Sequence, residues 1–177
     1  NVVGNQQLTT RFAGASARRA HNSQPTLVLA GSKGWLNDEI YQAPKKFGVE
    51  DRVKFVGHVE EDQLAALMSG CRAFVFPSLY EGFGLSPLEA MACGAPVILS
   101  NATSLPEVGG EAAFYVDPLS VEDIANKMMS IISDQMPVLS GVEGSDVRRQ
   151  LSITQAQKFS WEKAAVETLE VIEETAG

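Results

Sequence analysis

The stretch that decides the fold of this chain is Ala73-Phe74-Val75-Phe76-Pro77-Ser78-Leu79-Tyr80-Glu81-Gly82-Phe83-Gly84-Leu85-Ser86-Pro87-Leu88-Glu89. Its first four residues are apolar and predict a short buried strand, which Pro77 ends because proline cannot donate a hydrogen bond to a neighbouring strand. Gly82 and Gly84 predict a loop whose backbone can come close to a ligand. Apolar residues at helical spacing then predict a helix, with Pro87 in its first turn; they are Leu85, Leu88, Ala92 and Cys93. A helix entered from a glycine loop presents free N–H groups, which form a ready site for an anion.

Two carboxylates frame this unit, because Glu81 stands in the loop and Glu89 in the first turns of the helix. A ligand that carries both a phosphate and several hydroxyl groups would use the helix start and the two carboxylates together. Simpler interpretations stay open at this point. Ser86-Pro87-Leu88-Glu89 fits a capping box, in which Glu89 only satisfies a backbone N–H. Glu81 alone fits a solvated loop charge, and Phe83 alone fits a core residue.

Composition narrows the class of protein. The chain has 177 residues, 45% of them hydrophobic, which indicates one globular domain over residues 1–177. A net charge of −8 argues against a nucleic-acid groove. Cys71 and Cys93 stand apart from the two histidines, so no zinc-ligand spacing exists, and we expect free thiols in a cytoplasmic protein. No apolar run is long enough to span a bilayer, and no signal peptide opens the chain.

Strand and helix patterns alternate along the whole chain. Apolar runs predict strands at 2–4, 26–31, 53–57, 73–76, 96–100 and 113–116. Helical spacing predicts helices at 6–20, 36–47, 60–69, 121–133, 141–159 and 160–174, with a short turn at 104–108. Pro44 is expected to kink or end its helix, and Ser120 to cap the next long one. The alternation predicts an α/β, Rossmann-like fold, a parallel sheet with helices on both faces. Ligands of such sheets bind beyond the carboxyl ends of the strands, where loops 31–34, 57–59, 77–84, 100–106 and 117–118 lie.

The run from Pro77 to Val97 resembles a known family. The pattern Pro77-Ser78-x-x-Glu81-Gly82-Phe83-Gly84-Leu85-x-x-x-Glu89-Ala90-Met91-Ala92-x-Gly94-x-Pro96-Val97 is similar to the donor-site stretch of retaining GT-B glycosyltransferases of family 4, the glycosyl transferases group 1. The likeness extends from about Leu27 to the end of the chain. The run Ser100 to Glu107 is most similar to bacterial members that move mannose or similar hexoses onto envelope polysaccharides and glycolipids.

The resemblance implies a reaction and a division of labour. Such enzymes have two Rossmann-like domains, of which the C-terminal one binds the donor and the N-terminal one mostly binds the acceptor. This chain resembles the C-terminal half alone, so we expect it to bind a nucleotide-diphosphate sugar, with GDP-mannose as a first guess, and to be inactive by itself. The acceptor would be a saccharide or glycolipid reached through the missing domain. No cofactor or metal is implied. The full enzyme is expected in the cytoplasm, with room for peripheral association at the inner face of the cell membrane.

The resemblance also assigns roles to single residues. Glu81 would be the catalytic-site carboxylate that holds hydroxyls of the donor sugar, and Glu89 would hold the ribose. Gly82 and Phe83 would offer backbone contacts to the sugar, and the N–H groups of Gly84 and Leu85 would meet the diphosphate. We expect a side chain at position 84 to stand between these N–H groups and the phosphate.

Other donor-site residues are expected on neighbouring loops. They are His58, Val59 and Gly31. His58 would contact the base, although an ordinary exposed loop histidine fits equally. One departure concerns the arginine and lysine that the family places after its first strand, since Gly4-Asn5-Gln6-Gln7-Leu8 stands there. Arg11 and Lys33 are the nearest basic residues and the candidates for phosphate contacts. Either the chain begins with foreign or altered residues, or its donor binding is weakened.

Three kinds of function follow from these patterns. The first is the donor half of a glycosyltransferase, and the second is a module that binds a nucleotide or nucleotide-sugar without catalysis. The third is an interaction domain that has lost the ligand, against which the intact Glu81, Gly82, Gly84 and Glu89 argue.

Overall fold

The computed structural model describes residues 25–34, 38–133 and 145–176. These residues form two compact units, which are divided between Gly57 and His58. The strand expected at 2–4 and the helix expected at 6–20 lie outside the described residues. In the part of the chain that is described, no helix is long and apolar enough to cross a membrane.

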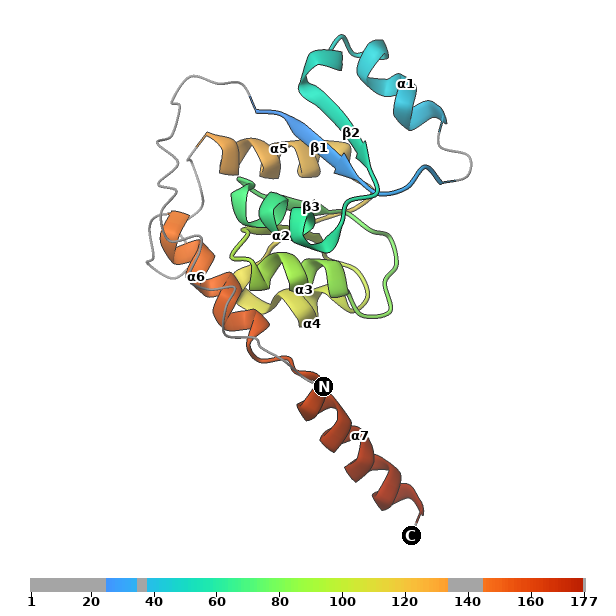
Figure 1. Ribbon diagram of the computed structural model, residues 1–177, viewed down its shortest axis with the longest axis vertical. Coiled ribbons are helices and arrows are strands. Elements are labelled where there is room, and N and C mark those ends of the chain that lie inside the picture. Colours follow the sequence, from blue (N-terminus) through green and yellow to red (C-terminus); the bar gives the residue numbers. More distant parts are fainter. Residues whose placement is uncertain (1–24, 35–37, 134–144, 177) are drawn as a thin grey trace. The chain divides into compact units, whose positions relative to one another are not determined.

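The first unit is built on a pair of parallel strands, β1 (Leu27–Ala30) and β2 (Val53–Gly57) (Figure 1). Between them come helix α1 (Asp38–Lys46) and a short 3-10 turn (Glu50–Arg52). Tyr41 of α1 packs on Phe55 of β2 with ring centroids 4.5 Å apart. The helix continues through Pro44 to Lys46, so the expected early end at this proline does not occur. Pro44 is buried in the last turn; it lacks the N–H that would donate to the Ile40 carbonyl, and the helix ends two residues later.

The second unit is built on three parallel strands in the order β3 (Phe74–Phe76), β4 (Val97–Ser100), β5 (Phe114–Val116). Phe74 pairs with Val97, and Ile98 pairs with Phe114. All four residues of the central strand β4 are buried, as its continuous apolar run predicts for a parallel sheet. The helices of this unit are α2 (Glu61–Gly70), α3 (Leu85–Ala92), α4 (Leu105–Gly109), α5 (Val121–Ile132), α6 (Ser145–Ala156) and α7 (Trp161–Ala176), with a 3-10 turn at Gly110–Ala112.

Helices cover both faces of this three-stranded sheet, because successive residues of a strand point to opposite faces. Leu99 belongs to the core cluster that holds Met91 of α3 and Leu105 of α4. Its neighbour Ile98 belongs to the opposite cluster, with Ile131 of α5. Figure 1 shows α5 on one side of the sheet and α3 and α4 on the other. The α/β architecture with parallel strands flanked by helices is thus confirmed.

Two features of the fold differ from expectation or refine it. The sequence predicted one sheet, whereas the structure has a two-stranded and a three-stranded sheet, one in each unit. Apolar runs identify strands but do not say which strand edges pair, which explains the difference. The cap of α5 is confirmed, because Ser120 Oγ accepts a hydrogen bond of 3.1 Å from the Asp123 N–H.

Arg149 is one of the residues that hold helix α6 to the rest of the unit. The Arg149 guanidinium donates hydrogen bonds to the carbonyl oxygens of Ser69 (2.9 Å), Gly94 (3.3 Å) and Cys71 (3.3 Å). These carbonyls lie at and just beyond the ends of α2 and α3, where helix carbonyl groups lack partners within the helix. Arg149 therefore ties three helices together.

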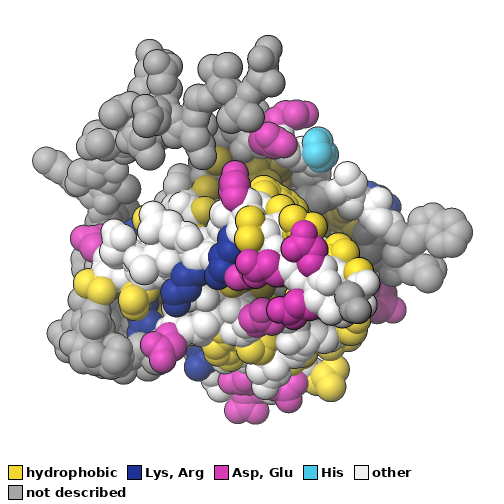
Figure 2. Space-filling model, turned by 90° about the horizontal axis from the view of Figure 1, so that it is seen from below, with side chains coloured by type: hydrophobic (Ala, Val, Ile, Leu, Met, Phe, Trp, Pro, Cys, Tyr) yellow, Lys and Arg dark blue, Asp and Glu magenta, His cyan; other side chains and the backbone are white. Residues whose placement is uncertain are grey.

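Acidic residues outnumber basic ones, 22 to 14, which gives the net charge of −8. Figure 2 shows acidic and basic side chains among hydrophobic and uncharged ones over one face.

Candidate functional site

Gly84 joins the loop after β3 to helix α3. It is buried and has φ 115° and ψ 52°, a left-handed conformation that favours glycine. A Cβ atom built there would lie 2.8 Å from Leu105 Cδ2. A side chain at position 84 would therefore point at α4 and not at the helix N–H groups. This direction differs from the one expected from the sequence.

The start of α3 leaves N–H groups free for a ligand. Gly84 is the N-cap residue, and no described side chain caps the helix. The Leu88 N–H bonds to the Gly84 carbonyl at 3.2 Å, and Pro87 has no N–H. The N–H groups of Leu85 and Ser86 are consequently the donors that a helix start leaves unpaired. Leu85 is 51% exposed, so this end of the helix reaches the surface.

The structure decides against the capping box at Ser86–Glu89. Ser86 is the second residue of α3 and not its cap, and Pro87 occupies the third helical position that the box assigns to a glutamate. Glu89 stands one turn further into the helix and is exposed. Its carboxylate is not used to end the helix.

The buried face of α3 agrees only in part with the one expected from the apolar spacing. Leu88 and Cys93 pack against the core as expected, whereas Leu85 and Ala92 are exposed. The fully buried residues stand at i, i+3 and i+4 on one face of the helix; they are Pro87, Ala90 and Met91. Leu85, Ser86 and Glu89 consequently all lie outside the core.

The two carboxylates have different surroundings and no partner of their own in the described structure. Glu81 is half-buried in the loop and Glu89 is exposed on α3. Among the described residues neither carboxylate takes part in an ion pair or accepts a hydrogen bond. The described residues also contain no group of three side chains that could hold a metal ion. Both carboxylates are free to accept hydrogen bonds from a ligand.

The backbone around Glu81 is held by the loop after β4. The Glu81 N–H donates to Thr103 Oγ1 at 3.1 Å. Ser104 Oγ lies within donating distance of two carbonyl oxygens, those of Phe83 (2.7 Å) and Glu81 (3.1 Å). The ring of Phe83 also meets Phe159 edge-on, with centroids 5.9 Å apart. These contacts join segments that are about twenty residues or more apart in the chain.

Tyr115 supports α4, the helix that follows this loop. Its hydroxyl lies within donating distance of the carbonyl oxygens of Gly110 (2.8 Å) and Pro106 (3.2 Å). Burial raises the pKa of Tyr115 to about 12. The phenol is therefore held protonated, as a donor to these carbonyls.

The remaining residues expected at the site belong to other segments of the chain. His58 and Val59 open the second unit, and His58 Nε2 lies 3.8 Å from Glu60 Oε1 at the surface. Gly31 and Lys33 belong to the first unit, where the Gly31 N–H bonds to the Gly57 carbonyl at 2.8 Å.

Lys33 makes two local contacts at the surface. Its Nζ lies 3.3 Å from Asp38 Oδ1 and 5.2 Å from the centre of the Tyr41 ring. Arg11 lies outside the described residues.

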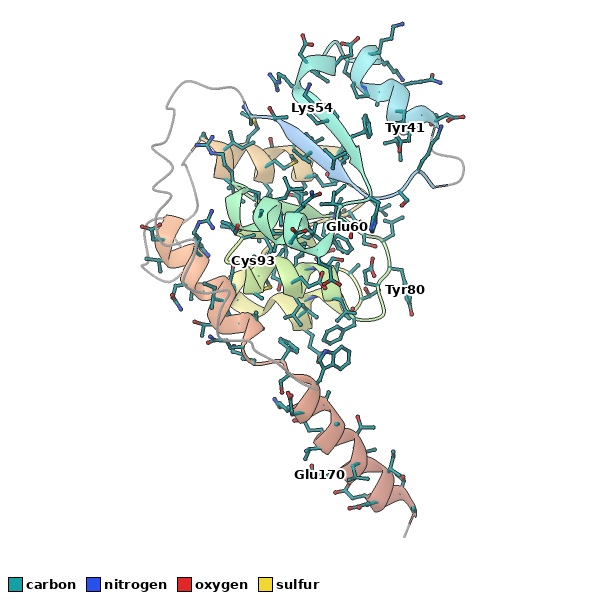
Figure 3. All side chains as sticks on the ribbon, in the orientation of Figure 1. Tyr41, Lys54, Glu60, Tyr80, Cys93 and Glu170 are labelled. Atoms are coloured by element: carbon teal, nitrogen blue, oxygen red, sulfur yellow. The ribbon has the colours of Figure 1, made fainter. Side chains whose placement is uncertain are left out.

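The two cysteines are free and half-buried. Burial raises the pKa of both thiols, and the charge of Glu89 adds to the rise at Cys93, while Arg149 opposes the rise at Cys71. Figure 3 shows Cys93 at the far end of α3 from the loop that carries Tyr80. The thiols therefore stand apart from the free helix start.

The arrangement can hold a ligand that combines an anion with hydroxyl groups. Free N–H groups suit the anion, and the Glu81 and Glu89 carboxylates suit the hydroxyls. Sequence reasoning placed loop 100–106 on the same rim but gave no role to Thr103 and Ser104. The run of hydroxyl residues directly after a buried strand was the signal that could have found them.

Comparison with known proteins finds relatives in both sequence and structure. The chain is 37% identical over 143 residues to the O-antigen chain mannosyltransferase B of Escherichia coli, covering 81% of this chain and 36% of that protein. It is 33% identical over 156 residues to the glycogen synthase of Mycobacterium tuberculosis, covering 87% and 36%. The structure resembles the sucrose-phosphate synthase of Thermosynechococcus elongatus with a TM-score of 0.72 at 29% identity, covering 88% and 39%.

These relatives are much longer than the present chain, which spans somewhat more than a third of each. The model of the family described as glycosyl transferases group 1 matches residues 7–151, most of the sequence. Its GT-B-like fold and its mannosyltransferase homologues agree with the resemblance carried by the Glu81–Glu89 stretch. The chain belongs to the glycosyl transferases group 1 family.

Proposed function

We propose that this chain is the donor-binding, C-terminal half of a retaining GT-B glycosyltransferase of family 4. The full enzyme transfers a hexose from a nucleotide-diphosphate sugar to a saccharide or glycolipid acceptor. The observation that carries the proposal is the uncapped start of α3, beside two carboxylates eight positions apart that have no partner among the described residues. That arrangement supplies an anion site and two hydroxyl-binding groups on one loop and helix.

Each part of this arrangement has a task in glycosyl transfer. Departure of the nucleotide builds negative charge on the diphosphate, and preorganised N–H groups stabilise such charge without a metal. The N–H groups of Leu85 and Ser86 supply this stabilisation. Glu81 accepts hydrogen bonds from hydroxyls of the donor sugar, and Glu89 from the ribose. In a retaining reaction the new bond forms on the same face of the sugar that the leaving group departs from, without a protein nucleophile.

Mannose is the sugar to test first. A mannosyltransferase of Escherichia coli is 37% identical to this chain, whereas the glycogen synthase is 33% identical. GDP-mannose is therefore the first donor, and UDP-glucose and ADP-glucose are the alternatives. A lipid-borne acceptor would place the full cytoplasmic enzyme at the inner face of the cell membrane.

The second candidate is a module that binds nucleotide or nucleotide-sugar but does not transfer it by itself. The chain spans about 36% of the curated relatives quoted above, so donor binding is the activity to test on this chain by itself. Adding an acceptor and measuring donor consumption separates the two, since a binding module holds the donor without consuming it.

Titration calorimetry with Glu89→Gln tests the proposal. A panel of GDP, UDP and ADP with their sugar conjugates is titrated into the chain, with Glu170→Gln as the control, because Glu170 is exposed on α7 (Figure 3). Loss of a charged acceptor for ribose hydroxyls should weaken the preferred nucleotide by roughly tenfold or more. The melting temperature of Glu89→Gln and the affinity of Glu170→Gln should stay close to wild type. A lower melting temperature with unchanged affinity would show that Glu89 only supports the helix.

A further inference from the structure

Thr103 and Ser104 fix the backbone on both sides of Glu81. Thr103 Oγ1 accepts from the Glu81 N–H (3.1 Å), and Ser104 Oγ reaches the Glu81 carbonyl (3.1 Å). The next residue, Leu105, packs against the Cα of Gly84 so closely that no Cβ fits between them. Three successive residues after β4 thus touch the loop that carries the carboxylate, and none of them contacts the carboxylate itself.

Thr103 adopts a backbone conformation that its own side chain disfavours. Its φ is 54°, and among the described residues no other non-glycine has a positive φ. For a β-branched residue this is an outlier, and such strain persists where surrounding contacts enforce it. This conformation brings Thr103 Oγ1 to the Glu81 N–H, so the strained backbone of Thr103 helps to position the Glu81 loop.

Among the described residues, the two hydroxyls make no hydrogen bond to the N–H groups of the first residues of α3. These N–H groups are those of Leu85 and Ser86. The contacts of Ser104 end at the Phe83 carbonyl (2.7 Å). The sugar end of the site is therefore held by the loop after β4, and the phosphate end by α3.

We propose that Thr103 and Ser104 are positioning residues, which hold Glu81 where it meets the hydroxyls of the donor sugar. This inference rests on the proposed donor-binding function. Without the two hydroxyls, the Glu81 loop moves while the helix start stays in place. A nucleotide-sugar then loses affinity, and the matching nucleoside diphosphate does not.

The test compares two ligands on the full 177-residue chain. Thr103→Gly removes the hydroxyl and relieves the positive φ, so folding is not harmed, and Ser104→Ala removes the second hydroxyl. Ser104→Thr keeps a hydroxyl and should restore binding. The controls are Thr168→Ala and Ser130→Ala, since these hydroxyls bond to local carbonyls of Ala164 and Lys127. Calorimetry gives the affinities for GDP-mannose and GDP, and for UDP-glucose and UDP.

A second measurement reads the loop without any ligand. Hydrogen exchange of the Glu81 amide should quicken in Thr103→Gly while the amides of β4 stay protected. With the nucleotide-sugar that the wild type binds, Thr103→Gly and Ser104→Ala should each lose roughly three- to tenfold in affinity, the equivalent of one hydrogen bond. The nucleoside diphosphate should change less than roughly twofold, as should both ligands in the controls.

Each outcome has a separate meaning. Equal losses for both ligands, or no loss for either, would overturn the positioning role and leave the donor-binding function standing. An unchanged exchange rate at the Glu81 amide would show that Thr103 does not hold the Glu81 loop. A wild-type chain that binds none of these four ligands, and neither ADP-glucose nor ADP, would overturn the donor-binding function and the positioning role with it.

Discussion

Replacement of Gly84 by alanine tests the geometry at the helix start most directly. The new Cβ would adopt φ 115° and lie 2.8 Å from Leu105 Cδ2. Leu105 is fully buried in the core cluster, so it has little room to move away. We expect Gly84→Ala to destabilise the chain and to displace the loop from α3.

The magnitude follows from two contributions. A left-handed conformation costs an ordinary residue about 1–2 kcal/mol, and overpacking of a core costs about 1–3 kcal/mol. Their sum is roughly 2–5 kcal/mol, which at about 2–4 °C per kcal/mol lowers the melting temperature of a chain of this size by roughly 4–20 °C. Because the loop and helix start move apart, nucleoside diphosphate binding should weaken as well.

Gly82→Ala is the matched control in the same loop. No heavy atom lies within 4 Å of the place that a Cβ atom would take at Gly82, and this glycine has no positive φ. Its replacement should change the free energy of unfolding by less than about 1 kcal/mol, in the stabilising direction. Chemical denaturation and circular dichroism of the two variants decide the matter. Equal stability of Gly84→Ala and Gly82→Ala would refute the close packing of Gly84 on Leu105.

Three further predictions concern the support of the second unit. Ser120→Ala removes the cap of α5 and should cost about 1 kcal/mol in urea unfolding, with an unchanged m-value; no loss would contradict the cap. Arg149→Leu leaves carbonyl groups of α2 and α3 without their charged donor and should cost roughly 1.5–3 kcal/mol, whereas Arg72→Leu, at an exposed position, should cost under about 0.5 kcal/mol. The raised pKa of Tyr115 means that the unfolded chain loses its phenolic proton first, so stability should fall as the pH rises from 10 to about 12. Tyr115→Phe should lack this part of the fall in stability. Urea midpoints of the wild type and of Tyr115→Phe, measured side by side over this pH range, would show the difference.

Local pattern was sufficient for much of the fold. The buried run of β4, the glycine entry into α3 and the Ser120 cap were all predicted, because each depends on residues close together in the chain. The family membership likewise follows from one contiguous stretch. Element bounds shifted by a few residues, and α1 runs two residues beyond Pro44 before it ends.

Contacts between distant segments could not be predicted. The capping box at Ser86 stayed open as an alternative because the sequence alone does not fix the N-cap residue, which is Gly84. The buried face of α3 was only partly predicted because packing against other elements selects it. The bonds from Thr103 and Ser104 to the Glu81 loop span more than twenty residues and leave no periodic trace. The direction of the Gly84 Cβ required the position of Leu105, which belongs to another helix.

The division of α3 into a buried face and an open face has an evolutionary consequence. Pro87, Ala90 and Met91 are constrained by the core, where added volume is costly. Ser86 and Leu85 are exposed, and surface substitutions usually change stability by less than about 0.5 kcal/mol. Mutational drift can therefore retune what this end of the helix recognises while the fold stays intact. A library randomised at the exposed positions should consequently retain mostly folded members, whereas one randomised at the buried positions should not.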